Sequence, residues 1–339
     1  MQVMASNRKT CLFMLLGIFA VLSHQTTSLP SEDYSMSIKH EAWMAQHKRY
    51  YDNNEEREKR FKIFKDNVKY IESFNRVGGQ TYVLEVNAFA DLTKEEFLTK
   101  YAGNYMPSLQ GSPSSSFKYE NVKEVPPSLD WRDKGAVTSV QNQAHCGACW
   151  AFSAVAAIEG IVQIKAGVQT SLSEQHIMDC DGAANGCQGG RMEHAFEFVN
   201  KNGVLASDKD YPYQVAEGTC SWDHPSSLAV KINGYERVPS KNETALLMAV
   251  ANQPVSVAID PSLFQFYKSG VVKGKCGTKL THAVAVVGYG TNEDGIKFWL
   301  LKNSWGGNWG ENGYIRLERG IDDIQGMCGL AIDATYPTA

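Results

Sequence analysis

The number and placement of the cysteines restrict the possible folds of this chain more than any other feature. Seven of the eight cysteines lie within residues 146–328, and the eighth, Cys11, lies near the amino-terminal end. Residues 1–23 are typical of a secretory signal, because Arg8 and Lys9 precede a short apolar run. Secretion favours disulfide formation. The seven cysteines that remain are odd in number, so they predict three disulfides and one free thiol.

The length and charge of the chain narrow the possible classes of protein. Its 339 residues leave room for a leader, a prosegment and an enzyme of two lobes. Hydrophobic residues make up 43% and charged residues 21%, so neither general disorder nor a bundle of membrane helices is expected. The net charge of -4 lacks the basic excess that nucleic acids and anionic membranes attract, so neither is expected as a partner.

Two segments ahead of the seven cysteines differ sharply in composition. Residues 38–75 carry dense charge and apolar side chains at helical intervals, which predicts amphipathic helices. Residues 103–127 are rich in proline, glycine and serine, which indicates an extended linker that proteases can reach. We therefore place a domain boundary in this linker.

After the linker, the composition changes from helix-forming to strand-forming. Residues 149–165 predict one long alanine-rich helix that ends at Gly167, and residues 192–199 predict a shorter one. Further along, β-branched and aromatic runs predict strands in residues 254–259, 282–290, 297–305 and 313–319. A helical lobe beside a β-rich lobe leaves a cleft between them, where ligands tend to bind.

The Cys-Gly-Ala-Cys sequence at residues 146–149 is compatible with three kinds of chemistry. A zinc site would need two further ligands at matching spacing, and the chain has no second CxxC or HxxxH pattern. A redox pair would join Cys146 to Cys149 and leave an odd cysteine among the other five. A nucleophilic Cys149 would instead need a histidine partner, and His282 followed by Asn303 occurs far downstream. This order of cysteine, histidine and asparagine favours the interpretation of Cys149 as a nucleophile.

The whole arrangement resembles the papain family of cysteine peptidases. Cys-Gly-Ala-Cys-Trp at residues 146–150, with His282 and Asn303 far downstream, matches the signature of that family. The resemblance extends into the prosegment, where the matching positions are Glu56, Arg60, Ile63, Phe64, Asn67, Ile71, Asn75, Asn87, Phe89 and Asp91. The glycine that usually begins the last of these motifs is Glu85 here.

The resemblance implies an α+β fold of two papain-like lobes, one helical and one resembling a β-barrel, with the active-site cleft between them. It implies a signal peptide in residues 1–23, a helical inhibitory propeptide in residues 24–124 and a mature peptidase domain in residues 125–339. The expected activity is endopeptidase hydrolysis through a thioester acyl-enzyme, with no metal or organic cofactor. The chain would be made as an inactive zymogen and matured in acid.

The resemblance assigns a role to each residue of the predicted active site. Cys149 would be the nucleophile, stabilised as a thiolate by the free N–H groups at the start of its helix. His282 would be its acid and base, holding the proton as an imidazolium. Asn303 would orient the His282 ring, and Trp305 would shield that hydrogen bond from water. Gln143, with the backbone N–H of Cys149, would stabilise the oxyanion.

Disulfide pairs and substrate contacts also follow from the resemblance. Six cysteines can pair in fifteen ways, and the sequence alone does not choose among them. The family pattern implies three pairs that leave Cys149 free: Cys146 with Cys187, Cys180 with Cys220, and Cys276 with Cys328. It also implies that the substrate contacts Gly189, Gly190, Met192, Ala258, Leu280, Ala283, Trp305 and Asp333.

Some of these residues would line the pocket for the second substrate residue upstream of the cleaved bond. Most of that lining is apolar, so Leu, Val or Phe is the expected preference. Asp333 is expected at the pocket floor and Arg191 at its mouth. If Arg191 pairs with Asp333, basic substrates gain nothing, whereas if Arg191 points to solvent, Asp333 stays available to a substrate Arg or Lys. We expect at most a minor tolerance of basic residues.

Expected partners are protein and peptide substrates, the chain's own propeptide and cystatin-type inhibitors, and the expected state is a monomer. Asn242, in the sequence Asn-Glu-Thr, is a predicted glycosylation site. Similarity to plant members indicates the secretory pathway, then the vacuole or the extracellular space. Two alternatives stay open: a family member that binds without catalysis, and a thiol-disulfide oxidoreductase with a bridge between Cys146 and Cys149.

Overall fold

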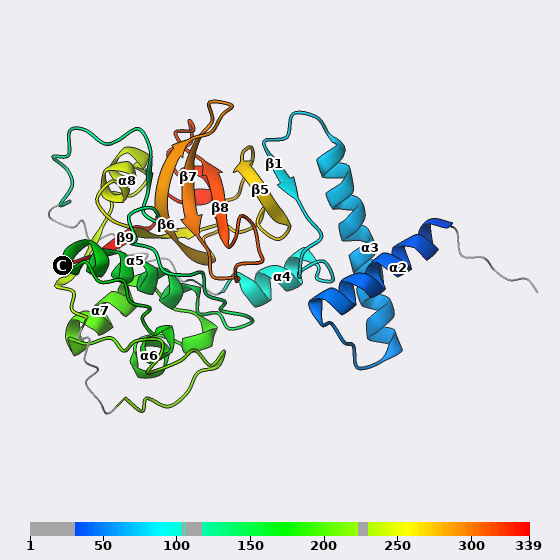
Figure 1. Ribbon diagram of the computed structural model, residues 1–339, viewed down its shortest axis with the longest axis horizontal. Helices are drawn as coiled ribbons and strands as arrows, with labels where there is room; N and C mark the ends of the chain where they lie inside the picture. Colours follow the sequence, from blue (N-terminus) through cyan, green and yellow to red (C-terminus); the bar gives the residue numbers. More distant parts are fainter. Residues whose placement is uncertain (1–30, 104, 106–116, 223–229) are drawn as a thin grey trace, which may run out of the picture. The chain divides into compact units, whose positions relative to one another are not determined.

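The computed structural model describes residues 31–103, 105, 117–222 and 230–339 (Figure 1). The predicted signal peptide and about half of the predicted linker lie outside the described residues. The chain divides into two compact units, residues 1–57 and residues 58–339.

The first unit contains the helix α2 (Ser31–His47) and the first turn of α3 (Asn54–Arg76). The rings of His40 and Trp43 stack with their centroids 5.9 Å apart. Arg57 forms an exposed ion pair with Glu41. These contacts confirm that the charged, aromatic stretch at the start of the predicted propeptide is helical.

The second unit begins with the rest of α3, which carries an apolar face. Phe64, Val68 and Ile71 are buried at intervals of four and three residues, the spacing of one helix face. The strand β1 (Tyr82–Leu84) and the helix α4 (Lys94–Tyr101) follow. The resulting assembly of a helix, a strand and a short helix continues directly into the segment that approaches the active site.

Polar side chains of α3 hold this assembly together. The two guanidinium nitrogens of Arg60 lie 2.6 and 3.0 Å from the carboxylate oxygens of Glu96, which begins α4 in a capping box with Thr93. Asn67 donates to the carbonyl oxygens of Ala90 and Leu92. The prosegment pattern that resembles the papain family therefore consists of residues that join α3 to the chain after it.

A helical lobe follows, and its main helix begins at the predicted nucleophile. The helix α5 ends at Gly167, whose left-handed φ of 70° favours glycine. Although α5 is long and apolar enough to cross a membrane, 67% of it is buried, as in the core helix of a globular protein. The elements of this lobe are α5 (Cys149–Ala166), α6 (Glu174–Cys180), the 3-10 turn η1 (Gly186–Gln188) and α7 (Met192–Asn202).

A β-rich lobe contains a nine-stranded sheet, counted over the described residues, whose order is β1-β5-β8-β7-β6-β4-β9-β3, with β2 paired to β6. All pairs are antiparallel except β5 with β8. Its strands after β1 are β2 (Leu129–Asp130), β3 (Gly234–Arg237), β4 (Val255–Ile259), β5 (Tyr267–Val272), β6 (His282–Thr291), β7 (Lys297–Lys302), β8 (Tyr314–Glu318) and β9 (Ala334–Thr338). The helix α8 (Glu243–Val250) and the 3-10 turn η2 (Met327–Gly329) accompany them.

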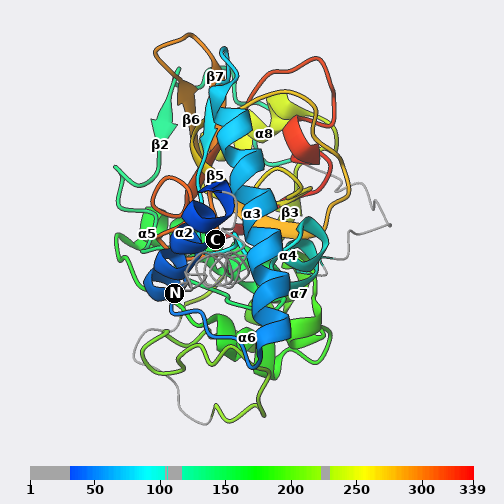
Figure 2. The ribbon, with the colours of Figure 1, turned by 90° about the vertical axis from the view of Figure 1, so that its right-hand side faces the viewer.

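The two lobes have separate hydrophobic cores, one between the sheet and α8 and one around α5 and α7. Figures 1 and 2 show α8 with β6 and β7 on one side of the molecule and α6 with α7 on the other. Hydrogen bonds join the lobes near the start of α5, since Ser153 donates to the carbonyl of Val284 (2.7 Å) and Ser256 donates to the carbonyl of Ser153 (2.8 Å). The predicted α+β fold of two lobes is confirmed.

Candidate active site

Cys149 is the first residue of α5 and is completely buried. Ala148 at the N-cap offers no side chain to the free N–H groups of the first turn, so these groups stay directed at the sulfur. Backbone N–H groups of Ala283, Trp150 and Cys149 itself interact with the sulfur and lower the pKa of the thiol against the larger, opposite effect of burial. The helix start therefore favours a thiolate, but burial outweighs this effect in the present structure.

His282 begins β6, one residue before the Ala283 N–H that reaches the sulfur. Its Nε2 lies 2.8 Å from Oδ1 of Asn303, and the same oxygen accepts a hydrogen bond from the backbone N–H of Ser304. Because Oδ1 is the acceptor, Nε2 carries the proton and Nδ1 of neutral His282 keeps its lone pair. Among the described residues, Nδ1 has no hydrogen-bond partner, so it is free to accept a proton.

Trp305 covers the hydrogen bond between His282 and Asn303. Its ring stacks on the His282 ring, with centroids 4.7 Å apart and an interplanar angle of 24°. Trp309 packs edge-on against Trp305 at 4.9 Å. His282 and Asn303 are both buried, so this pair lies in a low-dielectric environment where the hydrogen bond is strong.

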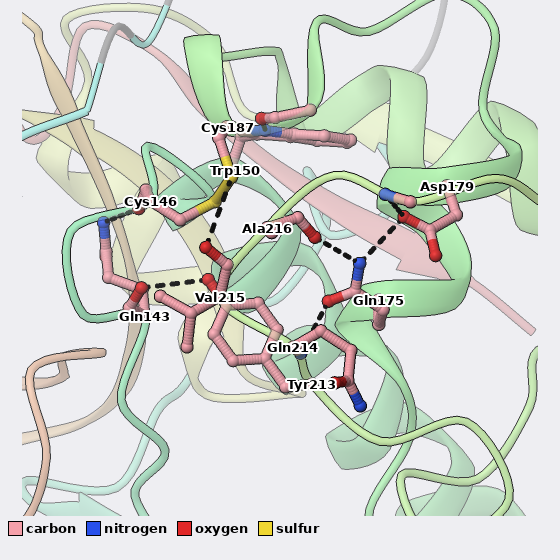
Figure 3. The surroundings of a disulfide bond; sticks show 12 residues. Gln143, Cys146, Trp150, Gln175, Asp179, Cys187, Tyr213, Gln214, Val215 and Ala216 are labelled. Atoms are coloured by element: carbon pink, nitrogen blue, oxygen red, sulfur yellow. Dashed lines mark hydrogen bonds between the residues drawn. A yellow bond between two sulfur atoms is a disulfide. The ribbon is translucent and has the colours of Figure 1, made fainter.

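Gln143 is completely buried near the start of α5. The hydroxyl of Ser304 donates to its Oε1 at 2.6 Å, which turns Nε2 toward the carbonyl oxygens of Cys146 (2.9 Å) and Tyr101 (3.5 Å). Figure 3 shows Gln143 beside the Cys146 disulfide, with the Tyr213 hydroxyl donating to its backbone carbonyl at 2.9 Å. The amide is thus held as a donor beside the nucleophile.

The prosegment runs directly over these groups. The carbonyl oxygen of Tyr101 accepts from the Trp305 indole N–H at 3.0 Å, and that of Ala102 lies 3.8 Å from the Cys149 sulfur. At Gly103, whose φ of +69° is left-handed, an added Cβ would lie only 2.6 Å from the same sulfur. Glycine at this position allows the backbone itself to close over the nucleophile.

This cover changes the protonation of both catalytic candidates. Burial raises the pKa of Cys149 to about 12. Burial also lowers the pKa of His282 to about 4, although the Asn303 side chain and the Ala102 backbone act in the opposite direction. Both groups are therefore neutral near pH 7 in this structure, unlike the thiolate and imidazolium expected from the sequence.

Three disulfides join the cysteines in the pairs that the family resemblance implies, Cys146–Cys187, Cys180–Cys220 and Cys276–Cys328. Cys149 is the one free cysteine among the described residues. Since Cys146 is bonded to Cys187 (Figure 3), it is not the redox partner of Cys149 in this structure. The oxidoreductase interpretation of the CxxC sequence is therefore wrong.

The predicted substrate residues lie around the covered nucleophile. Gly190 packs so closely on the Trp150 indole that an added Cβ would lie 2.7 Å from it, and Gly189 has a left-handed φ of 112°. Tyr105 of the prosegment belongs to the buried cluster that contains the predicted pocket residues Met192, Ala258, Leu280 and Ala283. Its hydroxyl donates to Oδ2 of Asp333, the residue expected at the pocket floor, at 2.7 Å.

Arg191 does not pair with Asp333, which corrects one of the two arrangements considered for this pocket. Its guanidinium contacts Nε2 of His194 at 2.6 and 3.1 Å, because both residues lie at the start of α7. Arg237 on β3 provides a cation instead, at 3.7 Å from Asp333. Sequence spacing could not indicate this contact, since β3 and Asp333 lie far apart along the chain.

The structure adds functional residues that the sequence did not indicate. Ser304 orients both Gln143 and Asn303, Tyr213 holds the backbone of Gln143, and Tyr105 donates to Asp333. Of these three residues, only Ser304 could have been indicated by the local sequence, because it is adjacent to Asn303. Asn242 is exposed, and its side-chain oxygen caps α8 by accepting from the Ala245 N–H.

A nucleophilic cysteine with a histidine and an amide partner, closed by the chain's own amino-terminal segment, defines the proform of a cysteine protease. The comparisons agree with this geometry. Residues 125–338 match the family described as "Papain family cysteine protease", and residues 40–97 match the "Cathepsin propeptide inhibitor domain (I29)".

Similar proteins resemble the chain over nearly its full length. The "Senescence-specific cysteine protease SAG39" of Oryza sativa subsp. indica is 50% identical, over 98% of this chain and 99% of that protein. "Vignain" of Ricinus communis is 47% identical, over 96% and 92%. The solved "Recombinant stem bromelain precursor" is 46% identical with a TM-score of 0.82, covering 90% of this chain and 99% of that one. The chain belongs to the papain family and is a papain-type cysteine endopeptidase, made as a zymogen with its own inhibitory propeptide.

Proposed function

We propose that Cys149 and His282 cleave peptide bonds through a thioester. Nδ1 of His282 accepts the thiol proton while the sulfur attacks the carbonyl carbon, and Gln143 with the Cys149 N–H stabilises the oxyanion. The imidazolium then protonates the leaving amine as the carbon–nitrogen bond breaks. Water, deprotonated by the same nitrogen, hydrolyses the thioester and restores the thiol. Thiol and imidazole supply all of this chemistry, so we propose no metal or organic cofactor.

The observation that best supports this proposal is the protonation state that Asn303 imposes on His282. Nε2 is committed as a donor to Asn303, so only Nδ1 can exchange protons with the substrate and the sulfur. The test is to mature the protein, alkylate the free thiol with iodoacetamide and measure peptide hydrolysis. Loss of hydrolysis in proportion to alkylation supports the mechanism. Full hydrolysis by completely alkylated enzyme contradicts it, because Cys149 would then not be the nucleophile.

Replacing Asn303 with alanine should weaken the enzyme without abolishing it. The nucleophile and base both remain, but the His282 ring loses the acceptor that sets its orientation and tautomer. We expect kcat/KM to fall roughly 10- to 100-fold, the usual cost of losing an orienting hydrogen bond. The change in kcat/KM is measured by steady-state hydrolysis, with the enzyme concentration fixed by active-site titration. An unchanged rate would mean that Trp305 packing alone orients the ring.

We propose that residues 24–124 are removed to give a mature enzyme of residues 125–339, and that acid promotes this step. The segment over Cys149 must leave before a substrate can bind. Its attachment depends in part on the ion pair between Arg60 and Glu96, whose nitrogen and oxygen atoms lie as close as 2.6 Å. The acid sensitivity of that pair gives a physical reason for maturation at low pH.

The hydrogen bonds from Arg60 lower the pKa of Glu96 from 4.5 to about 2, against the opposing effect of burial. A carboxylate with a depressed pKa stabilises the folded state above its unfolded pKa and loses that contribution as the pH falls. We therefore expect α4 to loosen progressively as the pH falls from about 4.5 toward 2. In an inactive Cys149→Ser zymogen, the hydrogen-exchange protection of α4, relative to the intrinsic exchange rate at each pH, should fall between pH 6 and pH 3.5.

A Glu96→Gln zymogen is the matched control for this pH effect. Glutamine can still form the capping box but carries no charge to lose. Its α4 should exchange faster than the unsubstituted helix at pH 6 and should respond less to acid. If both zymogens respond to pH in the same way, Glu96 is not the acid-sensitive group.

We propose that the pocket around Met192, Ala258, Leu280 and Ala283 receives an apolar substrate residue, the second upstream of the cleaved bond. These side chains are all buried and apolar, which favours hydrophobic substrates. Full burial of a Leu or Phe side chain contributes roughly 1.5 to 3 kcal/mol.

We further propose that the protein enters the secretory pathway through residues 1–23 and acts in the vacuole or the extracellular space. Its disulfides suit an oxidising compartment. Asn242 is exposed and carries the acceptor sequence for a glycan. Cystatin-type inhibitors are proposed partners of the uncovered site, and the mature enzyme is proposed to be a monomer.

A further inference from the structure

The last residues of the prosegment are docked on the β-rich lobe. The side chain of Tyr119 is 9% exposed, and its hydroxyl donates to Oε1 of Gln253 at 2.8 Å. Its ring packs on the ring of Tyr336, with centroids 5.2 Å apart. Beside it, the backbone N–H of Lys118 donates to Oε2 of Glu236 at 2.9 Å. We call Glu236, Gln253 and Tyr336, which all belong to the predicted mature domain, the Tyr119 site.

The polar groups of the Tyr119 site are fixed by other contacts of the mature domain. Gln253 is completely buried, and its Nε2 donates to the carbonyl of Pro337 at 2.9 Å, so its Oε1 is directed at Tyr119 as an acceptor. Glu236 also accepts from the Tyr336 hydroxyl. Burial, and then the charge of Glu236, raises the pKa of Tyr119 to about 12, so its hydroxyl remains a donor. The site therefore matches both the ring and the hydroxyl of a tyrosine.

The Tyr119 site is separate from the cover over the nucleophile. The strand order of the sheet begins with β1 and ends with β9 and β3. The prosegment contributes β1, which pairs with β5 at one end, whereas Glu236 on β3 and Tyr336 on β9 lie at the other end. Tyr119 belongs to the core between the sheet and α8, and Cys149 belongs to the core around α5. The propeptide thus contacts the sheet at both ends.

The proposed cut after Glu124 falls between two docked segments. Upstream, the backbone N–H of Val122 donates to the carbonyl of Tyr119 at 3.1 Å and closes a turn. Downstream, the carbonyl of Pro126 accepts from the Tyr289 hydroxyl at 3.0 Å, and β2 then pairs with β6. Residues 123, 124 and 126–128 are exposed. Hydrolysis of this exposed connection removes none of the contacts that hold Tyr119.

We propose that Tyr119 is a second anchor of the propeptide, which holds the cleaved propeptide on the mature domain independently of the cover over Cys149. The proposal rests on the proposed cut after Glu124. Release of the propeptide then requires two events, withdrawal of the cover from the nucleophile and departure of Tyr119 from its site. The ligand that the Tyr119 site recognises is the carboxyl-terminal part of the propeptide, residues 117–122.

The test measures how fast the cleaved propeptide leaves the mature domain. An inactive Cys149→Ser zymogen is cut within residues 123–128 by a second protease, and the dissociation rate of the propeptide is followed at pH 7. Tyr119→Phe should accelerate release about tenfold, because Gln253 loses a buried donor. Tyr119→Ala should accelerate it roughly a hundredfold or more. Tyr50→Ala is the matched control, because Tyr50 lies on the same propeptide but is 88% exposed, and it should leave the rate unchanged.

A variant on the mature side isolates the hydroxyl contact. In a Gln253→Leu background, Tyr119→Phe should change the release rate little, since the acceptor is already absent. An equal effect of Tyr119→Phe with and without Gln253 overturns the proposal. So does release of the Tyr119→Ala propeptide at the unsubstituted rate, or a matured enzyme that keeps Tyr119 at its own amino terminus. A matured enzyme that hydrolyses no peptide contradicts the proposed function instead, because these release rates require no catalysis by Cys149.

Discussion

Replacing Cys149 with serine is expected to abolish peptide hydrolysis while leaving the fold intact. Serine is nearly the same size, so the completely buried start of α5 keeps its packing. Its hydroxyl is a much weaker nucleophile than a thiol whose pKa the helix start can lower once the cover is removed. Loss of the nucleophile in a covalent protease costs on the order of a millionfold in turnover. The measurement is hydrolysis by the purified variant after its propeptide has been removed by another protease.

Two observations make this result specific to the thiol. Circular dichroism and thermal unfolding of the Cys149→Ser zymogen should match those of the unsubstituted zymogen, because the disulfides and both cores are unchanged. The variant should also remain uncleaved when stored alone, since it cannot remove its own propeptide. Spontaneous maturation of pure variant would show that Cys149 is not the nucleophile.

Replacing Phe97 with alanine should release the inhibitory segment. Phe97 is 1% exposed and packs edge-on against Trp305 at 5.1 Å, and it also contacts Phe89 at the same centroid separation. Truncating a buried phenylalanine costs about 3 to 5 kcal/mol. If most of this cost falls on the docking of the segment, its hold on the site weakens by at least roughly a hundredfold. Alkylation of Cys149 by iodoacetamide at pH 7 should accelerate accordingly.

Val83→Ala is the matched control, because Val83 lies on β1 of the same prosegment but is 47% exposed. It should change the alkylation rate little. Mature enzyme released from the Phe97→Ala zymogen should have normal activity, since Phe97 itself is removed with the propeptide. Slow alkylation of both zymogens would show that the cover depends on contacts other than the aromatic cluster around Trp305.

The sequence predicted the elements whose pattern is local. The helix from Cys149 was recognisable from its alanine-rich composition and Gly167, and the strands β4, β6, β7 and β8 from their β-branched and aromatic runs. The helix α6 was missed because its seven residues include the polar Gln175 and His176, which are buried here through tertiary contacts. The strand β1 was missed because it depends on pairing with β5, almost two hundred residues away along the chain.

The features of the active site can likewise be divided into those that the sequence predicted and those that depend on tertiary contacts. The residue types and their order along the chain were enough to predict Cys149, His282, Asn303 and Gln143 as site residues. In the structure, Asn303 lies within hydrogen-bond distance of His282, and Ser304 donates to Gln143. The cation that pairs with Asp333 could not be predicted, because Arg237 reaches Asp333 from another strand. Nor could the protonation state of the thiol be predicted, since the helix start favours an anion and burial in the folded zymogen reverses that preference.

The closed cover over Cys149 has a further consequence for how the disulfides are made. Thiol-disulfide exchange requires an accessible thiolate, and the burial of Cys149 that raises its pKa to about 12 removes both the anion and the access. While residues 101–103 are in place, the seventh cysteine cannot attack the Cys146–Cys187 bond, although Cys146 lies only three positions away along the chain. In the folded zymogen, the inhibitory segment therefore also keeps this thiol from exchanging with the three disulfides.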